Sequence, residues 1–89
     1  MRTIIRKSRF KKDFKKLQSS GKDLEKLAEV LRLLQQGRKL PEGCRDHNLT
    51  GNFSGCRECH ISPDWLPIFQ MTETELILVR TGSHSELFR

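Results

Sequence analysis

The run Leu76-Ile77-Leu78-Val79 decides the fold, because it is too apolar for a strand that exposes one face to water. It predicts a central strand over residues 76–81. The polar stretch Thr72-Glu73-Thr74-Glu75 before it is typical of a hairpin loop, so an antiparallel strand is expected over residues 66–71. The sheet is therefore expected to be built around the end of the chain.

Two further segments have the length of strands. Residues 2–6 are rich in β-branched side chains, and residues 56–61 form a short segment before a Ser-Pro turn signal. Pro67 cannot donate a ladder hydrogen bond, so the strand over residues 66–71 should lie at an edge or carry a bulge. The sequence thus predicts four or five strands.

The N-terminal half has the periodicity of helices. Phe10, Phe14 and Leu17 share one helical face, Ser8 is the expected N-cap, and residues 19–21 (Ser-Ser-Gly) end the helix. Four leucines at helical spacing then predict a second helix: Leu24, Leu27, Leu31 and Leu34.

The ends of the second helix are also signalled. Ser20 with Asp23 three residues later resembles a capping box, Gly37 is the expected C-cap, and Pro41 prevents the helix from continuing. Two successive amphipathic helices predict a helical hairpin that covers the sheet. The predicted fold class is α+β, with two N-terminal helices packed on a four- to five-stranded, mainly antiparallel sheet in a single domain over residues 1–89.

The chain is basic, with 17 Lys and Arg against 11 Asp and Glu, a formal charge of +6. Such an excess favours a polyanionic partner, either nucleic acid or an acidic protein, although a generic solvated surface gives the same composition. No apolar stretch approaches the ~20 residues that span a bilayer. The N-terminus, Met1–Lys7, lacks the apolar segment of a signal peptide, so we expect a cytoplasmic protein without a membrane partner.

The three histidines, His47, His60 and His84, all follow Pro41. Histidine titrates near pH 6.5, so it can both remove and donate protons at neutral pH. Cleavage of RNA by its own 2′-OH needs one group to take the hydroxyl proton and another to protonate the leaving 5′ oxygen, beside cations that stabilise the phosphorane. This chemistry needs no metal, and no cofactor is expected. Taken singly, each histidine is more often structural or merely exposed.

Three motifs hold these histidines: Asp46-His47-Asn48-Leu49-Thr50-Gly51, Gly55-Cys56-Arg57-Glu58-Cys59-His60-Ile61-Ser62-Pro63-Asp64-Trp65 and Arg80-Thr81-Gly82-Ser83-His84-Ser85-Glu86-Leu87-Phe88. They resemble, in the same order and at similar separations, the D-H-x-L-x-G, G-x-R-x-x-H-x-x-P-D-W and R-T-G-[ST]-H-x-x-L-F patterns of the YafQ-type toxins in the RelE/ParE superfamily. The Lys-rich N-terminal half resembles these toxins more loosely.

The resemblance implies a RelE-like fold and a type II toxin, an endoribonuclease that cleaves translated mRNA in the ribosomal A site. It implies as partners the ribosome and its mRNA, and a cognate antitoxin that inhibits the toxin; operator DNA would be met only through the antitoxin complex. By motif, His47, His60, Asp64 and His84 fall on the family's active-site positions.

We assign the general acid and base to His84 and His47, and expect His60 and Asp64 to orient the substrate or tune those two. Three further residues are expected to contact RNA: Arg57 and Arg80 at the phosphate, and Phe88 as the C-terminal aromatic associated with activity. From the residues alone, Asp64 could instead serve a turn after Ser62-Pro63, and Trp65 is expected in the core.

The chain departs from the family pattern in two respects that bear on activity. Family members often carry a tyrosine in the strand after Pro-Asp-Trp, where this chain has Phe69, and it contains no tyrosine at all. A tyrosine proton donor is therefore excluded, and Pro67 in the same strand could weaken activity. Cys56 and Cys59 occupy positions that the family does not reserve for cysteine.

Four lysines of the first helix lie mostly off its apolar face: Lys11, Lys12, Lys15 and Lys16. Together with Arg9 they form a cationic strip suited to the backbone of ribosomal RNA, to which such contacts add affinity without sequence specificity. A solvated helix face explains any single lysine equally well.

Three alternatives compete with the nuclease interpretation. Cys56-Arg57-Glu58-Cys59-His60 matches the C-x-x-C-H pattern of c-type haem attachment, although this chain shows no export signal. Cys44 and His47 with Cys56 and Cys59 have a zinc-like ligand spacing, which would make the chain a nucleic-acid-binding or structural module. Related folds that lack the histidine set poison gyrase, and the histidines argue against that activity.

Overall fold

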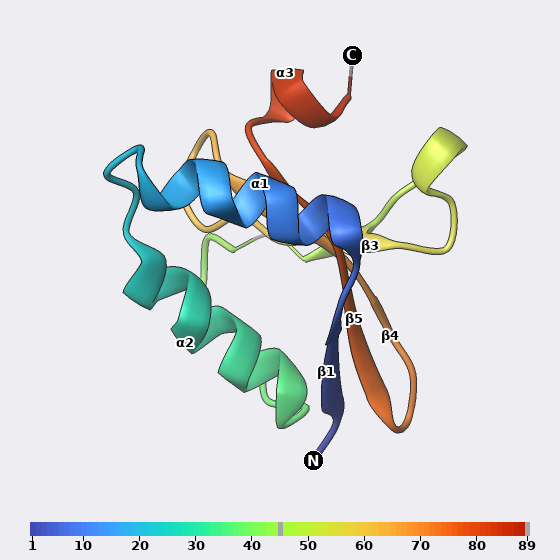
Figure 1. Ribbon diagram of the computed structural model, residues 1–89. Helices are drawn as coiled ribbons and strands as arrows, with labels where there is room; N and C mark the ends of the chain where they lie inside the picture. Colours follow the sequence, from blue (N-terminus) through green and yellow to red (C-terminus); the bar gives the residue numbers. More distant parts are fainter. Residues whose placement is uncertain (45, 89) are drawn as a thin grey trace.

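Five strands form one mixed sheet in the order β1-β5-β4-β3-β2, covered by two helices (Figure 1). The computed structural model describes residues 1–44 and 46–88. The strands are β1 (Thr3–Arg6), β2 (His47–Asn48), β3 (Arg57–Glu58), β4 (Leu66–Met71) and β5 (Glu75–Gly82). The helices are α1 (Ser8–Gln18), α2 (Leu24–Gln35), the short α3 (His84–Leu87) and the 3₁₀ turn η1 (Gly51–Phe53). The α+β class and the two covering helices are as predicted.

Strand β5 is an internal strand, which confirms the prediction from its apolar run. It pairs antiparallel with β4 on one side and parallel with β1 on the other, so only the β1 pairing departs from an antiparallel sheet. Leu76 and Leu78 are buried on the face that the helices cover, while Ile77 and Val79 alternate with them and are half-buried. The loop between β4 and β5 is closed by the Thr72 N–H, which donates to the Glu75 carbonyl at 2.9 Å.

Pro67 lies inside the sheet, next to the bulge that the sequence predicted. The pairing of β4 with β5 shifts register between Ile68 and Phe69, and β3 pairs with β4 only at these two positions. Pro67 therefore lies beyond the end of the β3 ladder, where a missing N–H donor costs no interstrand hydrogen bond on that side. The bulge alternative is confirmed, and the edge alternative is wrong.

The N-terminal helix caps differ from those predicted. Lys7 is the N-cap of α1, because its N–H still donates to the Leu78 carbonyl at 2.9 Å and the chain turns into the helix directly from the sheet; Ser8 is the first helical residue. Asp23, not Ser20, caps α2: its carboxylate accepts the Lys26 N–H at 3.2 Å.

The glycine predicted at the C-terminal end of α2 is in place, one residue beyond the C-cap, which is Gln36 and not Gly37. Gly37 has φ of +69°, in the left-handed region, and its N–H donates to the Leu34 carbonyl at 3.0 Å. The N–H of Arg38 donates to the Leu33 carbonyl at 2.9 Å. These two bonds form a Schellman motif, in which glycine avoids the steric cost of a left-handed residue.

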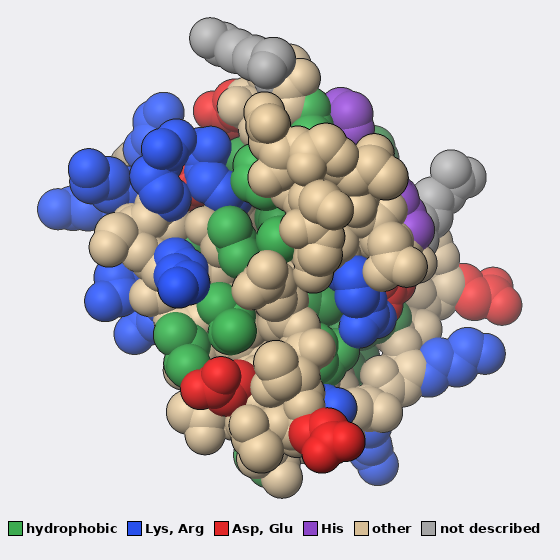
Figure 2. Space-filling view, turned by 90° about the vertical axis from the view of Figure 1, so that its right-hand side faces the viewer, with side chains coloured by type: hydrophobic (Ala, Val, Ile, Leu, Met, Phe, Trp, Pro, Cys, Tyr) green, Lys and Arg blue, Asp and Glu red, His purple; other side chains and the backbone are tan. Residues whose placement is uncertain are grey.

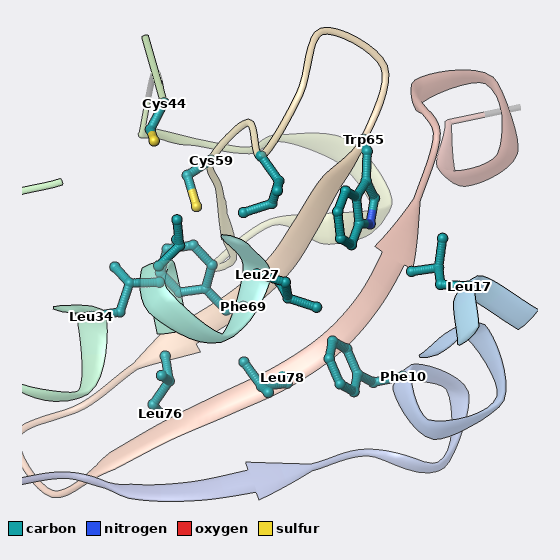
Figure 3. Close-up of a cluster of buried hydrophobic side chains, with 12 residues drawn as sticks. Phe10, Leu17, Leu27, Leu34, Cys44, Cys59, Trp65, Phe69, Leu76 and Leu78 are labelled. Atoms are coloured by element: carbon teal, nitrogen blue, oxygen red, sulfur yellow. The ribbon is translucent and has the colours of Figure 1, made fainter. Parts of the chain in front are cut away.

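The main core lies between β5, β4 and the two helices (Figure 3). Phe10 and Leu17 of α1 meet Leu27 of α2 over Leu78, with Cys44 and Cys59 at the far end of the cluster. Trp65 is a core residue as expected, only 2% exposed, and its indole N–H donates to the Thr81 hydroxyl at 3.0 Å. A buried indole needs such a partner, so the core satisfies the one polar atom that Trp65 brings into it.

Four elements were not predicted correctly from the sequence: β2, η1, β3 and α3. The strand expected over residues 56–61 is only Arg57–Glu58, because the N–H of His60 bonds to the Cys44 carbonyl and that of Ile61 to the Trp65 carbonyl, both outside the sheet. The helix α3 was not anticipated at all. No helix in the described part of the chain is long and apolar enough to cross a bilayer.

Candidate active site

Two segments that are distant in the sequence meet on a second, smaller apolar cluster. Its buried members are Cys56, Leu66, Ile68 and Leu87. Partly buried side chains complete it: Leu49, Phe53, Val79 and Phe88. Because Leu49 follows β2 and Phe88 follows α3, one cluster anchors both the segment that carries His47 and the segment that carries His84. Figure 2 shows histidine side chains at the surface in the upper right of this view.

The first of these segments holds an imidazole against a buried carboxylate. His47 lies opposite Glu58 in the β2–β3 register, and its Nε2 is 2.6 Å from Oε1 of Glu58. The histidine side chain is 52% exposed, whereas Glu58 is only 3% exposed. Oε2 of Glu58 has no hydrogen-bond partner among the described residues. Glu58 therefore holds the ring of His47 through its Nε2 atom.

The second segment presents His84 on a short capped helix. Ser83 and Glu86 form a capping box: the Ser83 N–H donates to Glu86 at 2.9 Å, and the Ser83 hydroxyl accepts the Glu86 N–H at 3.2 Å. These bonds hold the pKa of the Glu86 carboxyl below its usual range. The exposed ring of His84 lies 4.6 Å from that of Phe88, which in turn meets Phe53 edge-on at 5.6 Å. The aromatic chain links α3 to η1.

His60 and Asp64 lie beyond the end of β3. His60 is half-buried and lines a pocket of about 580 Å³ together with α2 and the chain around Cys44. Asp64 is exposed in a tight turn, in which the Trp65 N–H donates to the Ser62 carbonyl at 3.2 Å. Asp64 thus has the turn position that the sequence allowed, and its side chain remains accessible.

Arg57 is engaged by the residue that precedes His47. Its guanidinium forms a two-pronged ion pair with Asp46 and lies over the Phe69 ring, 5.2 Å from the ring centre. Neighbouring residues of a strand point to opposite faces, so Arg57 and Glu58 lie on opposite faces of β3. In this arrangement Arg57 stabilises the segment that carries His47, and a phosphate contact would require it to leave Asp46.

Arg80 is similarly held by α1. Its Nε and Nη2 donate to Asp13 at 2.8 and 3.1 Å, and the Thr81 N–H donates to the same carboxylate at 3.2 Å. The hydrogen bond to Asp13 raises the pKa of the guanidinium further above its usual value. A guanidinium has five N–H donors, so this pair fixes Arg80 while leaving it donors for a second anion.

The α1 lysines form a separate feature. Lys11, Lys12, Lys15 and Lys16 are all exposed. In Figure 2 the Lys and Arg side chains gather on the left, and hydrophobic side chains lie between them and the histidines on the right. The exposed lysines of α1 therefore form a cationic surface that is separate from the histidines.

Sequence reasoning missed three residues that position the candidate groups: Asp13, Asp46 and Glu58. Each is an acid whose partner lies in another element, so its role depends on a tertiary pairing that spacing does not encode. Only the register of β2 against β3 places Glu58 opposite His47. Phe53 was also missed, because η1 lies in a loop with no periodic signal.

The metal and haem alternatives do not match this arrangement. Among residues 1–44 and 46–88, no group of three or more His, Cys, Asp or Glu side chains is placed to hold a metal ion. Cys59 is buried in the main core and Cys56 in the second cluster, so the two thiols cannot both reach one haem in this fold. Burial, with Cys44 nearby, raises the pKa of the Cys59 thiol to about 12.

Comparisons with known proteins identify close relatives over the whole chain. The family model for the bacterial toxin of the type II toxin–antitoxin system, YafQ, matches residues 2–89. The mRNA interferase toxin YafQ of Escherichia coli K12 is 38% identical over 88 residues, which make up 98% of this chain and 96% of the relative.

Solved structures give the same result for the fold. The E. coli DinJ–YafQ toxin–antitoxin complex matches with a TM-score of 0.90 and 37% identity, covering 99% of this chain and 98% of the matched chain. A metal-bound toxin from Helicobacter pylori matches with a TM-score of 0.92 and 43% identity, covering 99% of this chain and all of the other. The arrangement of three helices on a five-stranded mixed sheet is therefore that of the YafQ structures.

Proposed function

Because the chain belongs to the YafQ family of bacterial type II toxins, we propose that it is a ribosome-dependent endoribonuclease that cleaves translated mRNA in the A site. The family assignment makes it an mRNA interferase, the activity for which its E. coli relative is named.

A single observation supports the choice of catalytic groups. His47, backed by the buried carboxylate of Glu58, and His84, packed on Phe88, are anchored by the same small apolar cluster. One imidazole is held in place by a buried carboxylate, and the other is exposed on a capped helix end. Two imidazoles presented in this way can act on opposite sides of one phosphate.

The proposed reaction is an internal transesterification. Glu58 accepts the Nε2 proton of His47, so Nδ1 is assigned to take the proton from the 2′-OH, as in carboxylate–histidine pairs of other enzymes. The 2′ oxygen attacks phosphorus, the bond from phosphorus to the 5′ oxygen breaks, and His84 gives its proton to that oxygen. The products are a 2′,3′-cyclic phosphate and a 5′-OH, and no metal takes part.

The remaining candidates would support this reaction. His60 and Asp64 are assigned to orienting the substrate, since one is half-buried beyond β3 and the other is exposed in the following turn. Arg80, fixed by Asp13, would bind a phosphate oxygen and stabilise the charge on the phosphorane. Phe88 would position His84 and contact a base. Arg57 would contribute through Asp46 unless substrate draws it away.

Two macromolecular partners follow from this function. The exposed lysines of α1 suit the backbone of ribosomal RNA, and their contribution should weaken steeply with salt. A cognate antitoxin would hold the toxin inactive, and the formal charge of +6 favours an acidic segment on that protein. Operator DNA would be bound only through the antitoxin complex.

Mapping the 5′ ends of ribosome-bound mRNA, before and after induction of the chain without antitoxin, tests this function. We expect growth arrest and new 5′ ends inside reading frames, at codons in the A site, which disappear when His84→Ala replaces the native chain. Wild-type toxicity in His47→Ala, His60→Ala and His84→Ala alike would contradict histidine catalysis. New ends on naked RNA at the same rate would contradict ribosome dependence.

A further inference from the structure

A groove of about 640 Å³ lies beside the candidate active site, where η1 approaches the start of α1 over β5. Its apolar lining comes from Phe53, Val79 and Leu87, and its polar lining includes Lys7, Arg9 and Arg80. The volume is within the ~300–1,000 Å³ range of small-molecule sites, enough for one nucleotide. Of the residues assigned to the reaction, only Arg80 lines it; the three histidines and Asp64 do not.

The charge of the groove is one-sided. Lys7 and Arg9 are exposed, and no acidic side chain is among the described residues that line the groove. Asp13 lies behind Arg80 and fixes its guanidinium without lining the groove. The groove therefore offers two solvent-facing cations and one preoriented cation to an anion, a composition that suits a phosphate.

The groove also offers an aromatic surface. The rings of Phe53 and Phe88 meet at 81°, an edge-on contact that leaves at least one face of Phe53 outside it. Sites for single-stranded nucleic acid combine such stacking platforms with cations that follow the backbone. Phe53 touches Phe88, which touches His84. An RNA strand bound in the groove would therefore continue toward His84, the candidate general acid.

We propose that this groove binds one unpaired nucleotide of the RNA substrate, next to the scissile phosphate, with its base on Phe53 and its phosphate between Lys7 and Arg9. The proposal rests on the proposed function in that the ligand is the RNA to be cleaved. An acidic segment of a partner protein would use the same cations, but stacking against Phe53 distinguishes a base from a carboxylate.

Binding of a short single-stranded RNA tests the proposal. The probe carries 2′-O-methyl riboses, so that no 2′-OH can attack, and a fluorescent 2-aminopurine base whose emission falls on stacking. The variants are Phe53→Leu, which keeps an apolar side chain without a ring face, and Arg9→Gln and Lys7→Gln. Arg38→Gln and Lys39→Gln are matched controls, because both residues are exposed and line none of this groove.

Loss of stacking in Phe53→Leu should weaken binding about 5- to 150-fold, the range found for stacked bases, and abolish the fluorescence change. Arg9→Gln and Lys7→Gln should each weaken binding of every sequence and reduce the salt slope by about one. The controls should leave affinity and slope unchanged. Since Lys7 and Arg9 are exposed, their replacement keeps the test valid even if Phe53→Leu fails to fold.

Wild-type affinity and fluorescence in Arg9→Gln and Lys7→Gln would overturn the proposal. Wild-type RNA binding combined with weaker binding of the antitoxin would also overturn it, by assigning the groove to a protein. If the groove variants bind RNA more weakly but the native chain does not cleave mRNA in cells, the groove proposal stands and the nuclease proposal is contradicted. If the native chain cleaves mRNA but the groove variants bind RNA normally, the nuclease proposal stands and the groove proposal is contradicted.

Discussion

Replacing Glu58 by methionine should stabilise the fold while it impairs the activity. The carboxylate is 3% exposed, and its Oε2 has no hydrogen-bond partner among the described residues. Removing the charge abolishes a desolvation penalty that amounts to several kcal/mol for a buried ion. The loss is one hydrogen bond to His47, whose ring is 52% exposed and can bind water instead.

The expected net gain is about 1–2 kcal/mol, the lower part of the 1–4 kcal/mol seen when buried ion pairs are replaced by apolar residues. For a chain of this size that gain raises Tm by roughly 4–8 °C per kcal/mol. Removing the other partner, His47, should change the free energy of unfolding in the opposite direction. His47→Ala leaves the buried Glu58 carboxylate without its hydrogen bond to the imidazole, so it should lower the free energy of unfolding by about 1–3 kcal/mol.

Urea denaturation of both variants gives the two signs, and cleavage of ribosome-bound mRNA gives the activity. Glu58→Met should cleave up to about 10²-fold more slowly, the lower bound for loss of a general base, because His47 is no longer held. Glu58→Gln, which keeps an acceptor for His47, should lose less. A destabilised Glu58→Met with wild-type cleavage would refute the reasoning on both counts.

Asp13→Asn should lower the free energy of unfolding by about 1–3 kcal/mol, because a charged acceptor of bonds from Arg80 is lost; an unchanged urea midpoint would contradict this role. Gly37→Ala should cost about 1–2 kcal/mol at φ of +69°, with Gly37→Asn less harmful, as measured by Tm; equal losses would argue against a left-handed cap. Cys59, whose pKa burial raises to about 12, should resist iodoacetamide at pH 8 until urea unfolds the chain, as mass spectrometry would show; rapid native labelling would mean that the main core opens.

The elements best predicted from the sequence are those whose own side chains specify them. The apolar run over Leu76–Val79 predicted an internal strand, which β5 is, and β4 has the bounds that its flanking turn signals indicated. The Gly37 cap followed from a conformational requirement that few other residues meet. In these cases the local pattern and the tertiary environment agree, so either alone gives the answer.

The elements that were missed depend on partners elsewhere in the chain. α3 has only one turn, too short for a periodic signal, and it is held by Leu87 in the second cluster and by the Ser83 capping box. Residues 59–61 look like a continuation of β3, yet their N–H groups bond to loops that no local pattern places there.

The candidate site likewise contains some residues that the sequence predicted and others that only the structure shows. Motif resemblance named His47 and His84, but the carboxylate behind His47 and the acids that hold both arginines came only from the structure. The arginines illustrate the difference. Each looks like a free phosphate ligand in the sequence, and each is found in an ion pair within the fold. Strand alternation separates Arg57 from Glu58, although they are neighbours in sequence.

The most direct test of the central claim, that His47 and His84 act as base and acid on one phosphate, uses mRNA whose scissile 5′ oxygen is replaced by sulfur. A thiolate leaves without a proton, so it makes the general acid dispensable. On ribosomes programmed with this message, His84→Ala should cleave at nearly the wild-type rate, while His47→Ala should stay as slow as it is on the oxygen linkage. Equal slowness of both variants on the sulfur linkage, or full activity of both on the oxygen linkage, would contradict the account.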